Sequence, residues 1–349
     1  MKILQDGGMN RRGLLFGAAA VGGGALLSAC TSNSADTDPT VAASGNGAND
    51  KPGKAVTIGF SAPAADHGFI AAIASNAKAQ AKSYSDVTFS ATEGTNDVAI
   101  QVAAVQSMIN KKVDAIVILP FDGKALTEVA TKAMNAGIPV INLDRVFSSP
   151  VAYRTWIGGD NYGAGVSAGN YIGNRLKDKK NPVILEIAGP DNLELTKERS
   201  AGFKAGLANY GLKLTDRQAG DFTAATGQKV AAQMLQGHSK VDAIWNQDDD
   251  QGIGVEAAIK QADRDEFFMV GCAGSAHVLQ EIKAGKGPVE ATVLYSPTMA
   301  ATAVTMARLI AQGKGMADTA EKDVPASVTT YSAVVTKKNV DSYMSVGFK

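Results

Sequence analysis

The stretch IPVINLDR at residues 138–145 is a short apolar strand that runs directly into an acid and a base. Gly137 and Pro139 mark the break in the chain at its start. In a parallel α/β sheet, ligands bind at the carboxyl ends of the strands. We therefore predict that Asp144 and Arg145 form the polar centre of a small-molecule cleft. For this pair taken alone, a solvated ion pair at a strand end is an equally good interpretation.

The alternation of an apolar strand with a helix recurs along the chain. Helical patterns with one apolar face separate most of the strands, as at Val98, Val102 and Val105. Such alternation predicts a mainly parallel sheet with helices on both faces. The strands are too many for one sheet, so we predict an α/β fold of two doubly wound parallel-sheet lobes. The predicted strands lie at residues 56–60, 87–89, 115–119, 140–143, 183–187, 212–219, 243–245, 267–270 and 291–294.

The first 29 residues, 1–29, are predicted to be a signal peptide that is not part of the folded domain. Arg11 and Arg12 precede an apolar run that ends in the sequence Leu-Ser-Ala-Cys. This pattern resembles a bacterial lipoprotein signal, with Cys30 as the lipid-modified residue. The paired arginines favour twin-arginine export, although Sec export stays open as an alternative. Met9 is an alternative start to Met1. We expect an exported chain, lipid-anchored on the outer face of the cell membrane.

Residues 30–53 are predicted to be the lipidated cysteine and a flexible tether. From Thr31 to Gly53 the chain has no Leu, Ile or aromatic residue, so this segment buries too little apolar surface to fold. The whole chain has 34 basic and 34 acidic residues, a balance that argues against nucleic acid as a partner. If Cys30 carries lipid, Cys272 has no disulfide partner, and we predict that it is a buried small hydrophobe.

The sequence patterns of common catalytic and metal centres are missing. The histidines His67, His238 and His277 do not form a His-Glu-x-x-His motif, and no paired cysteines occur. The acidic run at residues 248–250 fits no register of a calcium-binding loop. A loose dinucleotide-binding match at residues 163–168 is better explained by tight helix packing. We therefore predict no metal site, no cofactor and no enzymatic activity.

Polar and aromatic residues instead follow most of the predicted strands. Such a set suits a sugar, because carboxylate and guanidinium groups bind adjacent hydroxyls while aromatic rings stack on the C–H face. Each of these residues taken singly is more often structural, and their shared place at strand ends is what indicates a binding site. They include Asp66, His67, Phe69, Asp144, Arg145, Arg199, Asp221, Phe222, Asp248 and Tyr295.

These residues and their surroundings resemble the ribose- and galactose-type sugar-binding proteins of bacterial ABC importers, the type I periplasmic-binding family. The resemblance covers about residues 54–337 and depends on several segments together, none of which is specific alone. The segments are VTIGFSAPAADHGFI, AGIPVINLDR, IGGDNYGAG, ERSAGF, GDF, IWNQDDDQGIG and EATVLYSP.

The resemblance implies two lobes that close on one monosaccharide. Phe69 and Phe222 would sandwich the sugar ring from opposite lobes, and two acids against two arginines would suit a neutral sugar or polyol. The hydroxyl geometry must differ from that of ribose, because four positions depart from the ribose-type pattern, namely His67, Asp248, Ala273 and Tyr295. The implied ligand contacts are His67, Phe69, Asp144, Arg145, Arg199, Phe222, Asp248 and Tyr295.

Three crossovers would join the lobes in such a protein, near Gly159-Asp160, near Tyr295-Ser296 and around Pro325. The N-terminal lobe (N-lobe) would then contain residues 54–159 and 296–325. The C-terminal lobe (C-lobe) would contain residues 160–295 and 326–349.

The implied function is that of a monomeric solute-binding subunit that delivers its sugar to the permease of an ABC importer. The alternative is a sensor with the same fold, which would present a sugar or a furanosyl signal to a membrane receptor. An enzyme on this fold lacks a supporting motif. A DNA-binding regulator of the LacI type is disfavoured, because an export signal stands where its helix-turn-helix would be.

Overall fold

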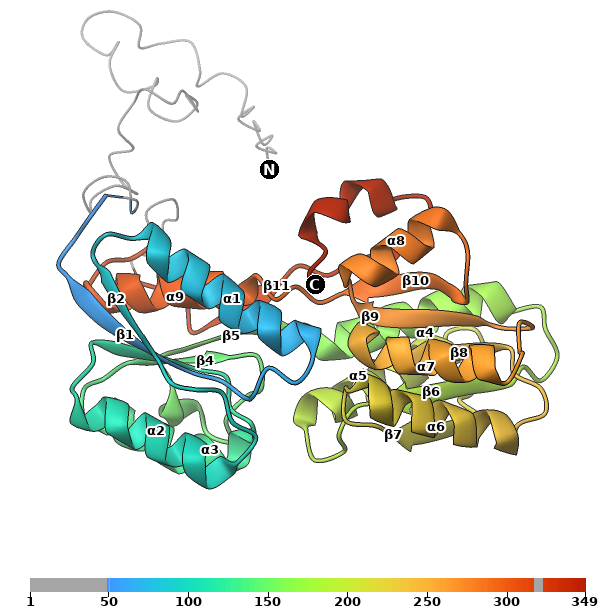
Figure 1. Ribbon diagram of the computed structural model, residues 1–349, viewed down its shortest axis with the longest axis horizontal. Helices are drawn as coiled ribbons and strands as arrows, with labels where there is room; N and C mark the ends of the chain where they lie inside the picture. Colours follow the sequence, from blue (N-terminus) through green and yellow to red (C-terminus); the bar gives the residue numbers. More distant parts are fainter. Residues whose placement is uncertain (1–48, 50, 317–322) are drawn as a thin grey trace, which may run out of the picture.

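The computed structural model describes residues 49, 51–316 and 323–349, which form two α/β lobes side by side (Figure 1). Each lobe has a six-stranded sheet with helices on both faces, which confirms the predicted fold class. The predicted signal peptide, the lipidated Cys30 and nearly all of the predicted tether lie outside the described residues. None of the helices in the described ranges has the length and apolar character needed to cross a membrane.

The N-lobe sheet is entirely parallel, in the order β11-β5-β4-β3-β1-β2. Its central strands are continuous apolar runs because helices cover both faces. Helices α1 (Gly68–Ser83) and α9 (Met299–Ala311) cover one face, and α2 (Val98–Asn110) and α3 (Gly123–Asn135) cover the other. The strands are β1 (Val56–Ser61), β2 (Val87–Ala91), β3 (Ala115–Ile118), β4 (Val140–Leu143), β5 (Thr155–Gly159) and β11 (Ser327–Thr330).

The C-lobe sheet has the order β12-β10-β9-β8-β6-β7, and only the edge strand β12 is antiparallel to its neighbour. Helices α4 (Asn161–Leu176) and α5 (Glu194–Ala208) cover one face; α6 (Ala224–Gly237), α7 (Asp249–Gln261) and α8 (Ala276–Ala284) cover the other. The strands are β6 (Ile184–Ala188), β7 (Asp216–Ala219), β8 (Ala243–Asn246), β9 (Phe268–Ala273), β10 (Val289–Leu294) and β12 (Val334–Thr336).

The chain passes between the lobes three times. Two passages lie where the sequence places them, between β5 and α4 and between β10 and α9. The third was predicted around Pro325 and is wrong, because the chain first adds β11 to the N-lobe sheet beside β5. Pairing begins directly after the proline, where the Trp156 backbone nitrogen donates to the Ala326 carbonyl at 3.0 Å. The chain therefore crosses between β11 and β12, and the N-lobe extends to Thr330.

Close packing of α4 on α5 explains the dinucleotide-like match at residues 163–168. A Cβ atom on Gly165 would lie 2.1 Å from the Arg199 carbonyl oxygen, and one on Gly169 would lie 2.5 Å from the Phe203 carbonyl oxygen. The small residues therefore let two helix backbones meet. This contact also fixes α5, which carries Arg199.

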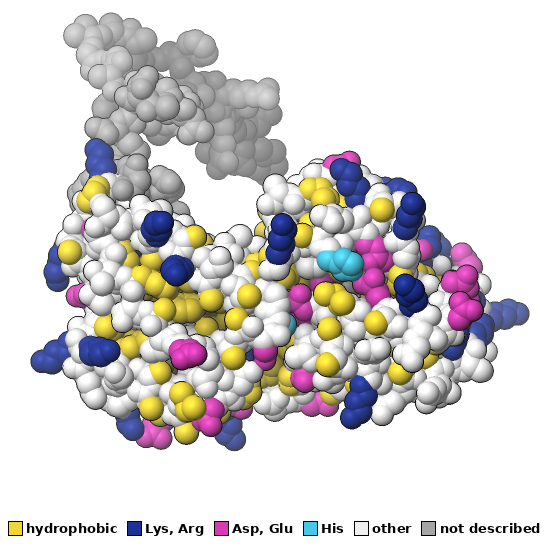
Figure 2. All heavy atoms as spheres, in the orientation of Figure 1, with side chains coloured by type: hydrophobic (Ala, Val, Ile, Leu, Met, Phe, Trp, Pro, Cys, Tyr) yellow, Lys and Arg dark blue, Asp and Glu magenta, His cyan; other side chains and the backbone are white. Residues whose placement is uncertain are grey.

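Cys272 is fully buried in β9 and is a free thiol, as predicted. Burial raises its pKa to about 12, so the thiol stays protonated and unreactive at neutral pH. On the face of the molecule drawn in Figure 2, basic and acidic side chains are interspersed over both lobes, in keeping with the balanced composition.

Candidate ligand-binding cleft

Loops at the carboxyl ends of strands from both sheets meet between the lobes. The N-lobe contributes the start of α1 after β1 and the turn after β4, and the C-lobe contributes α5 and the loops after β7, β8, β9 and β10. All eight residues predicted to contact a ligand line one cavity between the lobes. Its walls are His67, Phe69, Ile70, Asp144, Arg145, Leu195, Arg199, Phe222, Asp248, Ala273 and Tyr295.

Asp144 and Arg145, which open the argument from sequence, make separate contacts. The Tyr295 hydroxyl donates a hydrogen bond to Asp144 Oδ1, and the Asp144 side chain is buried. Arg145 Nη1 donates to the Phe121 carbonyl oxygen at 2.9 Å, while its buried Nε has no hydrogen-bond partner among the described residues. The interpretation as a solvated ion pair is therefore wrong, because no ion pair joins these two residues and Asp144 faces the cavity.

Three residues that line the cavity have left-handed backbone conformations. The φ angle is 61° at Asp144, 72° at Phe222 and 128° at Ala273. Residues other than glycine rarely adopt these backbone conformations, because a positive φ angle brings Cβ close to the backbone. Such strain persists only where surrounding structure enforces it, and it is concentrated at functional sites. The three loops thus hold their side chains in the cleft at a cost in local stability.

Arg199 is fixed before any ligand arrives. Its Nε donates to Asn161 Oδ1 at 3.0 Å, and its Nη1 donates to the Gln247 carbonyl oxygen at 2.9 Å. The guanidinium carbon lies 4.6 Å from the centre of the Tyr295 ring, a cation–π contact. No hydrogen bond from the described residues engages Nη2, so this nitrogen is left as a donor.

Aromatic rings from the two lobes face the same cavity, as the resemblance implies for Phe69 and Phe222. The Phe69 ring centre lies 5.7 Å from that of Tyr295, and the His67 ring centre lies 6.3 Å from that of Phe222. The Phe222 ring rests on backbone, since a Cβ atom on Gly189 would lie 2.0 Å from its Cζ. Tight seating of this kind keeps a stacking surface in one orientation.

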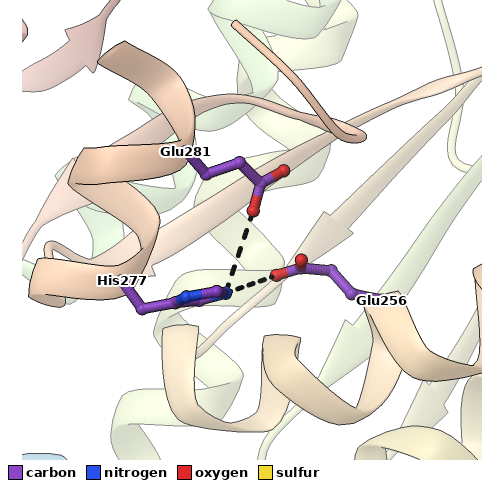
Figure 3. Close-up of side chains that lie close together, drawn as sticks. All are labelled: Glu256, His277 and Glu281. Atoms are coloured by element: carbon purple, nitrogen blue, oxygen red, sulfur yellow. Dashed lines mark ion pairs between the residues drawn. The ribbon is translucent and has the colours of Figure 1, made fainter. Parts of the chain in front are cut away.

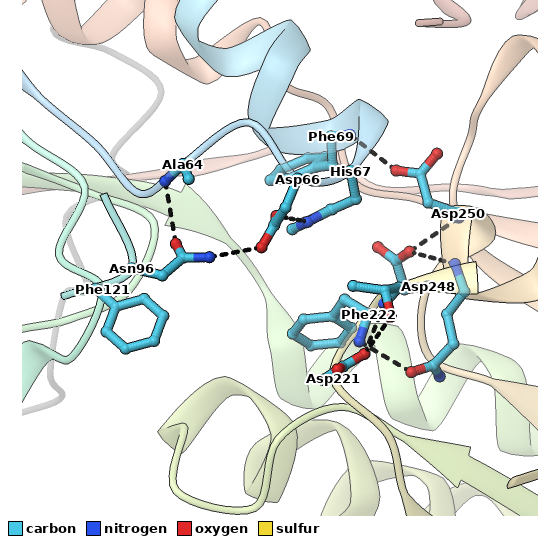
Figure 4. Close-up of polar contacts among 12 residues, drawn as sticks. Ala64, Asp66, His67, Phe69, Asn96, Phe121, Asp221, Phe222, Asp248 and Asp250 are labelled. Atoms are coloured by element: carbon cyan, nitrogen blue, oxygen red, sulfur yellow. Dashed lines mark hydrogen bonds and ion pairs between the residues drawn. The ribbon is translucent and has the colours of Figure 1, made fainter. Parts of the chain in front are cut away.

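His67 is oriented by a short chain of hydrogen bonds (Figure 4). The Asn96 amide donates to Asp66 Oδ2 at 2.7 Å, and Asp66 Oδ1 lies 2.6 Å from His67 Nδ1. The carboxylate favours a proton on Nδ1, which leaves Nε2 of the neutral ring as an acceptor. Asp66 and Asn96 therefore position His67 without lining the inner cavity.

The three consecutive acids, residues 248–250, have three different roles, and Figure 4 shows two of them, Asp248 and Asp250. Asp248 lines the cavity and caps α7, accepting from the Asp250 and Gln251 backbone nitrogens at 2.9 and 3.0 Å. Asp249 is buried and accepts from the backbone nitrogens of Gly274 and Ser275 at 2.7 and 2.8 Å. Asp250 reaches across to the N-lobe, where the Phe69 backbone nitrogen donates to its Oδ2 at 2.8 Å.

Sequence reasoning missed this role of Asp250. An acid in the first turn of a helix is ordinarily explained by the helix dipole. Here the carboxylate also caps α1 of the opposite lobe, because it accepts from a nitrogen in the first turn of that helix. No pattern in the sequence of either helix reveals the contact, since it exists only when the lobes are placed together.

Burial changes the titration of two groups in the cleft. Burial, and then the charge of Asp250, raise the pKa of Asp248 well above its ordinary value. Burial, and then the charge of Asp144, raise the pKa of Tyr295 well above its ordinary value, so the Tyr295 hydroxyl keeps its proton. A ligand that donates hydrogen bonds to the Asp144 and Asp248 carboxyl groups would offset the cost of burying them. The hydroxyls of a sugar can donate in this way.

Comparisons with known proteins agree with this geometry. Residues 58–315 match the model of the periplasmic binding protein domain family. The chain is 28% identical over 274 residues to the ribose import binding protein of Bacillus subtilis, covering 78% of this chain and 85% of that protein. It is 31% identical over 204 residues to the D-ribose/D-allose-binding protein of Pseudomonas aeruginosa, covering 56% of this chain and 63% of that protein.

A solved structure shows the same arrangement of lobes. It is the periplasmic binding protein component of the arabinose ABC transporter from Shewanella sp. ANA-3, bound to α- and β-L-arabinofuranose. This structure has a TM-score of 0.74 and 26% sequence identity, covering 83% of this chain and 94% of that one. The family model spans most of the described chain, and both lobes match. The chain therefore belongs to the periplasmic binding protein domain family.

Proposed function

We propose that this protein binds a neutral monosaccharide or polyol in the cleft and delivers it to the permease of an ABC importer. The observation that carries the proposal is the convergence, in one cavity, of acids, arginines and aromatic rings from both lobes. The relatives named above include import and binding proteins for ribose, allose and arabinofuranose.

The chemistry of the walls supports a ligand with several hydroxyl groups. A hydroxyl both donates and accepts, so one ring can donate to Asp144 and Asp248 while it accepts from Arg145 and Arg199. Phe69 and Phe222 would then cover its C–H faces from the two lobes. The formal charges of the two acids and two arginines in the cleft balance, which suits a neutral ligand.

Closure of the lobes would couple binding to transport. A ligand shifts an equilibrium between open and closed forms only if it binds one of them more tightly. Contacts from both lobes meet this requirement, because a ligand makes both sets only when the lobes are together. The hydrogen bond between Phe69 and Asp250 already joins the lobes beside the cavity. We expect the closed form, as a monomer, to present both lobes to the permease.

Thermal-shift screening over pentoses, hexoses, inositols and pentitols tests the proposed ligand class. A true ligand at a hundredfold excess over its dissociation constant should stabilise the fold by about 2.7 kcal/mol. Cells that lack the gene should then lose uptake of the radiolabelled ligand. Retained uptake, with loss of a transcriptional response to the sugar, would show the sensor function instead. No thermal shift with any of these compounds would contradict the ligand class.

The lipid anchor at Cys30 is a separate part of the proposal and comes from sequence alone. We expect wild-type cells fed an alkyne fatty acid to label this chain, and expect the chain to sediment with membranes. Cys30→Ser should abolish labelling and release the exported chain into the soluble fraction. Cys272→Ser is the control, since the buried Cys272 thiol is out of reach of lipid transfer. Labelling that survives in Cys30→Ser would refute the anchor.

A further inference from the structure

We propose that Glu256, His277 and Glu281 bind one divalent transition-metal ion, with Zn²⁺ as the model ion. These residues lie on the helical face of the C-lobe where α7 and α8 lie side by side (Figure 3). The site is separate from the cleft, and none of its residues lines the cavity. Its existence does not depend on the proposed transport function.

The three side chains converge from two helices. His277 and Glu281 are one turn apart on α8, so they lie on the same face, and Glu256 comes from α7. His277 Nε2 is 3.5 Å from Glu256 Oε1 and 3.9 Å from Glu281 Oε2. One ligand atom from each residue lies within 4.8 Å of the other two.

These distances suit a metal ion that would lie between the three atoms. Zinc bonds to imidazole nitrogen and carboxylate oxygen are about 2.0–2.2 Å long, so tetrahedral geometry puts neighbouring ligand atoms roughly 3.3–3.6 Å apart. The separation of 3.5 Å already lies in this range, and that of 3.9 Å needs a movement of a few tenths of an ångström. A set of one imidazole and two carboxylates is suited to zinc and its neighbours in the first transition series.

A second and independent observation is that one buried oxygen of each carboxylate has no hydrogen-bond partner among the described residues. The Glu281 side chain is only 9% exposed, and its Oε2, which points toward His277, has no hydrogen-bond partner. Glu256 Oε1 is also buried without a hydrogen-bond partner. Among the described residues, His277 is the only basic group that pairs with either carboxylate. A buried carboxylate oxygen without a partner is unfavourable, and a cation between the two would remove that penalty.

The surroundings of the three side chains resemble those of a preorganised metal site. The Val289 backbone nitrogen donates to Glu281 Oε1 at 2.9 Å, which orients this carboxylate and leaves Oε2 for the metal. Gly287 makes room for Glu281 Oε1, since a Cβ atom at residue 287 would lie 2.3 Å from that oxygen. The His277 side chain is 55% exposed. Solvent can therefore deliver the ion and supply a fourth ligand.

The sequence alone predicts no metal site, because no short zinc motif occurs. Only the His277–Glu281 spacing is local, and a single pair of this kind is common on helices. Glu256 joins the pair through the packing of α7 and α8 against the same sheet face. The proposed site therefore departs from the expectation drawn from sequence.

The test is a calorimetric titration of the EDTA-treated, dialysed full chain with ZnCl₂. We expect one Zn²⁺ per chain and a higher melting temperature with Zn²⁺ than without it. His277→Ala should weaken this binding by about 100-fold or more, because even partners that only orient a ligand contribute roughly 10–100-fold. Glu256→Gln should weaken Zn²⁺ binding in the same way. The metal-free variant should melt no lower than metal-free wild type, since a buried carboxylate oxygen without a hydrogen-bond partner is removed.

His238→Ala is the matched control. His238 also pairs with a carboxylate in the C-lobe, with Nε2 3.1 Å from Asp216 Oδ2, but it belongs to no three-ligand cluster of the described residues. Zinc binding should be unchanged in this variant. The proposal is overturned if wild type shows no saturable binding of one Zn²⁺. Equal affinity in wild type and His277→Ala would also overturn it, because the ion would then be bound elsewhere.

Discussion

Asp144→Asn is expected to weaken binding of the ligand found by thermal shift about 100-fold, the largest effect of any single change in the cleft. Hydrogen bonds to a charged group contribute about 1.5–3 kcal/mol each, against about 0.5–1.5 kcal/mol for neutral ones, and a carboxylate makes two of them to adjacent hydroxyls. Asparagine tolerates the φ of 61° at this position, so the backbone should persist. Isothermal titration calorimetry measures the change directly.

Asp122→Asn serves as the control for this result. Asp122 also follows an N-lobe strand, but its carboxylate accepts from the Ala125 backbone nitrogen at 2.9 Å and caps α3, outside the cavity. We expect Asp122→Asn to reduce stability slightly and to leave affinity within about threefold of wild type, since only a helix cap is weakened. Equal affinity in Asp144→Asn and wild type would show that the ligand is bound elsewhere.

Arg308→Ala should lower the free energy of unfolding by about 3–5 kcal/mol, because it leaves a buried carboxylate without its cation. Arg308 is fully buried on α9, and its Nε and Nη2 donate to Asp86 Oδ1 and Oδ2 at 2.8 and 2.6 Å. Its Nη2 also donates to the Lys51 carbonyl oxygen at 2.9 Å, which ties the start of the folded domain to α9. Chemical denaturation of the two proteins measures the difference.

Arg175→Ala is the matched change at an exposed pair. Arg175 Nη2 lies 2.9 Å from Glu290 Oε1, but the Arg175 side chain is 50% exposed. Solvent screens such a pair, so its loss should cost no more than about 1 kcal/mol. Similar losses from Arg308→Ala and Arg175→Ala would contradict a stabilising role for the buried pair.

The stability gap between wild type and Arg308→Ala should depend on pH. The hydrogen bonds from Arg308 hold the pKa of Asp86 well below its ordinary value. The unfolded chain therefore binds a proton at Asp86 before the folded chain does as the pH falls, so the contribution of the pair is complete above about pH 5 and declines below it. We expect the gap to narrow steadily between pH 5 and pH 2. A gap that is constant over this range would argue against an ionised Asp86.

Much of the cleft is predictable from local patterns. The strand at residues 138–143 is a continuous apolar run because both faces of its sheet are covered, and a charged pair at its end marks the carboxyl edge. The same reasoning finds His67, Phe222 and Asp248, each of which follows a strand and lines the cavity. Alternating strands and helices also suffice for the fold class.

Other elements leave weak signals in the sequence. Strand β5 ends in two glycines, and neither this strand nor α9 is among the elements that the sequence predicts. The predicted strand at residues 212–219 is ordered as β7 only from Asp216. Near Pro325 the proline resembled a boundary, although the strand that follows it pairs with β5. Each of these segments takes its place in the fold by packing against an element that is distant in the sequence.

The sequence by itself determined the two α/β lobes and a set of polar and aromatic residues after the strands, because strand–helix alternation and the carboxyl-edge rule are local properties of a chain. The choice of eight ligand contacts within that set came from the family resemblance. Only the tertiary structure decided which strand ends and helices meet. It joined Tyr295 to Asp144, Asp250 to the start of α1, and Glu256 to the His277–Glu281 pair. These contacts connect residues that are far apart in sequence, and they exist only where the sheets, helices and crossovers place them together.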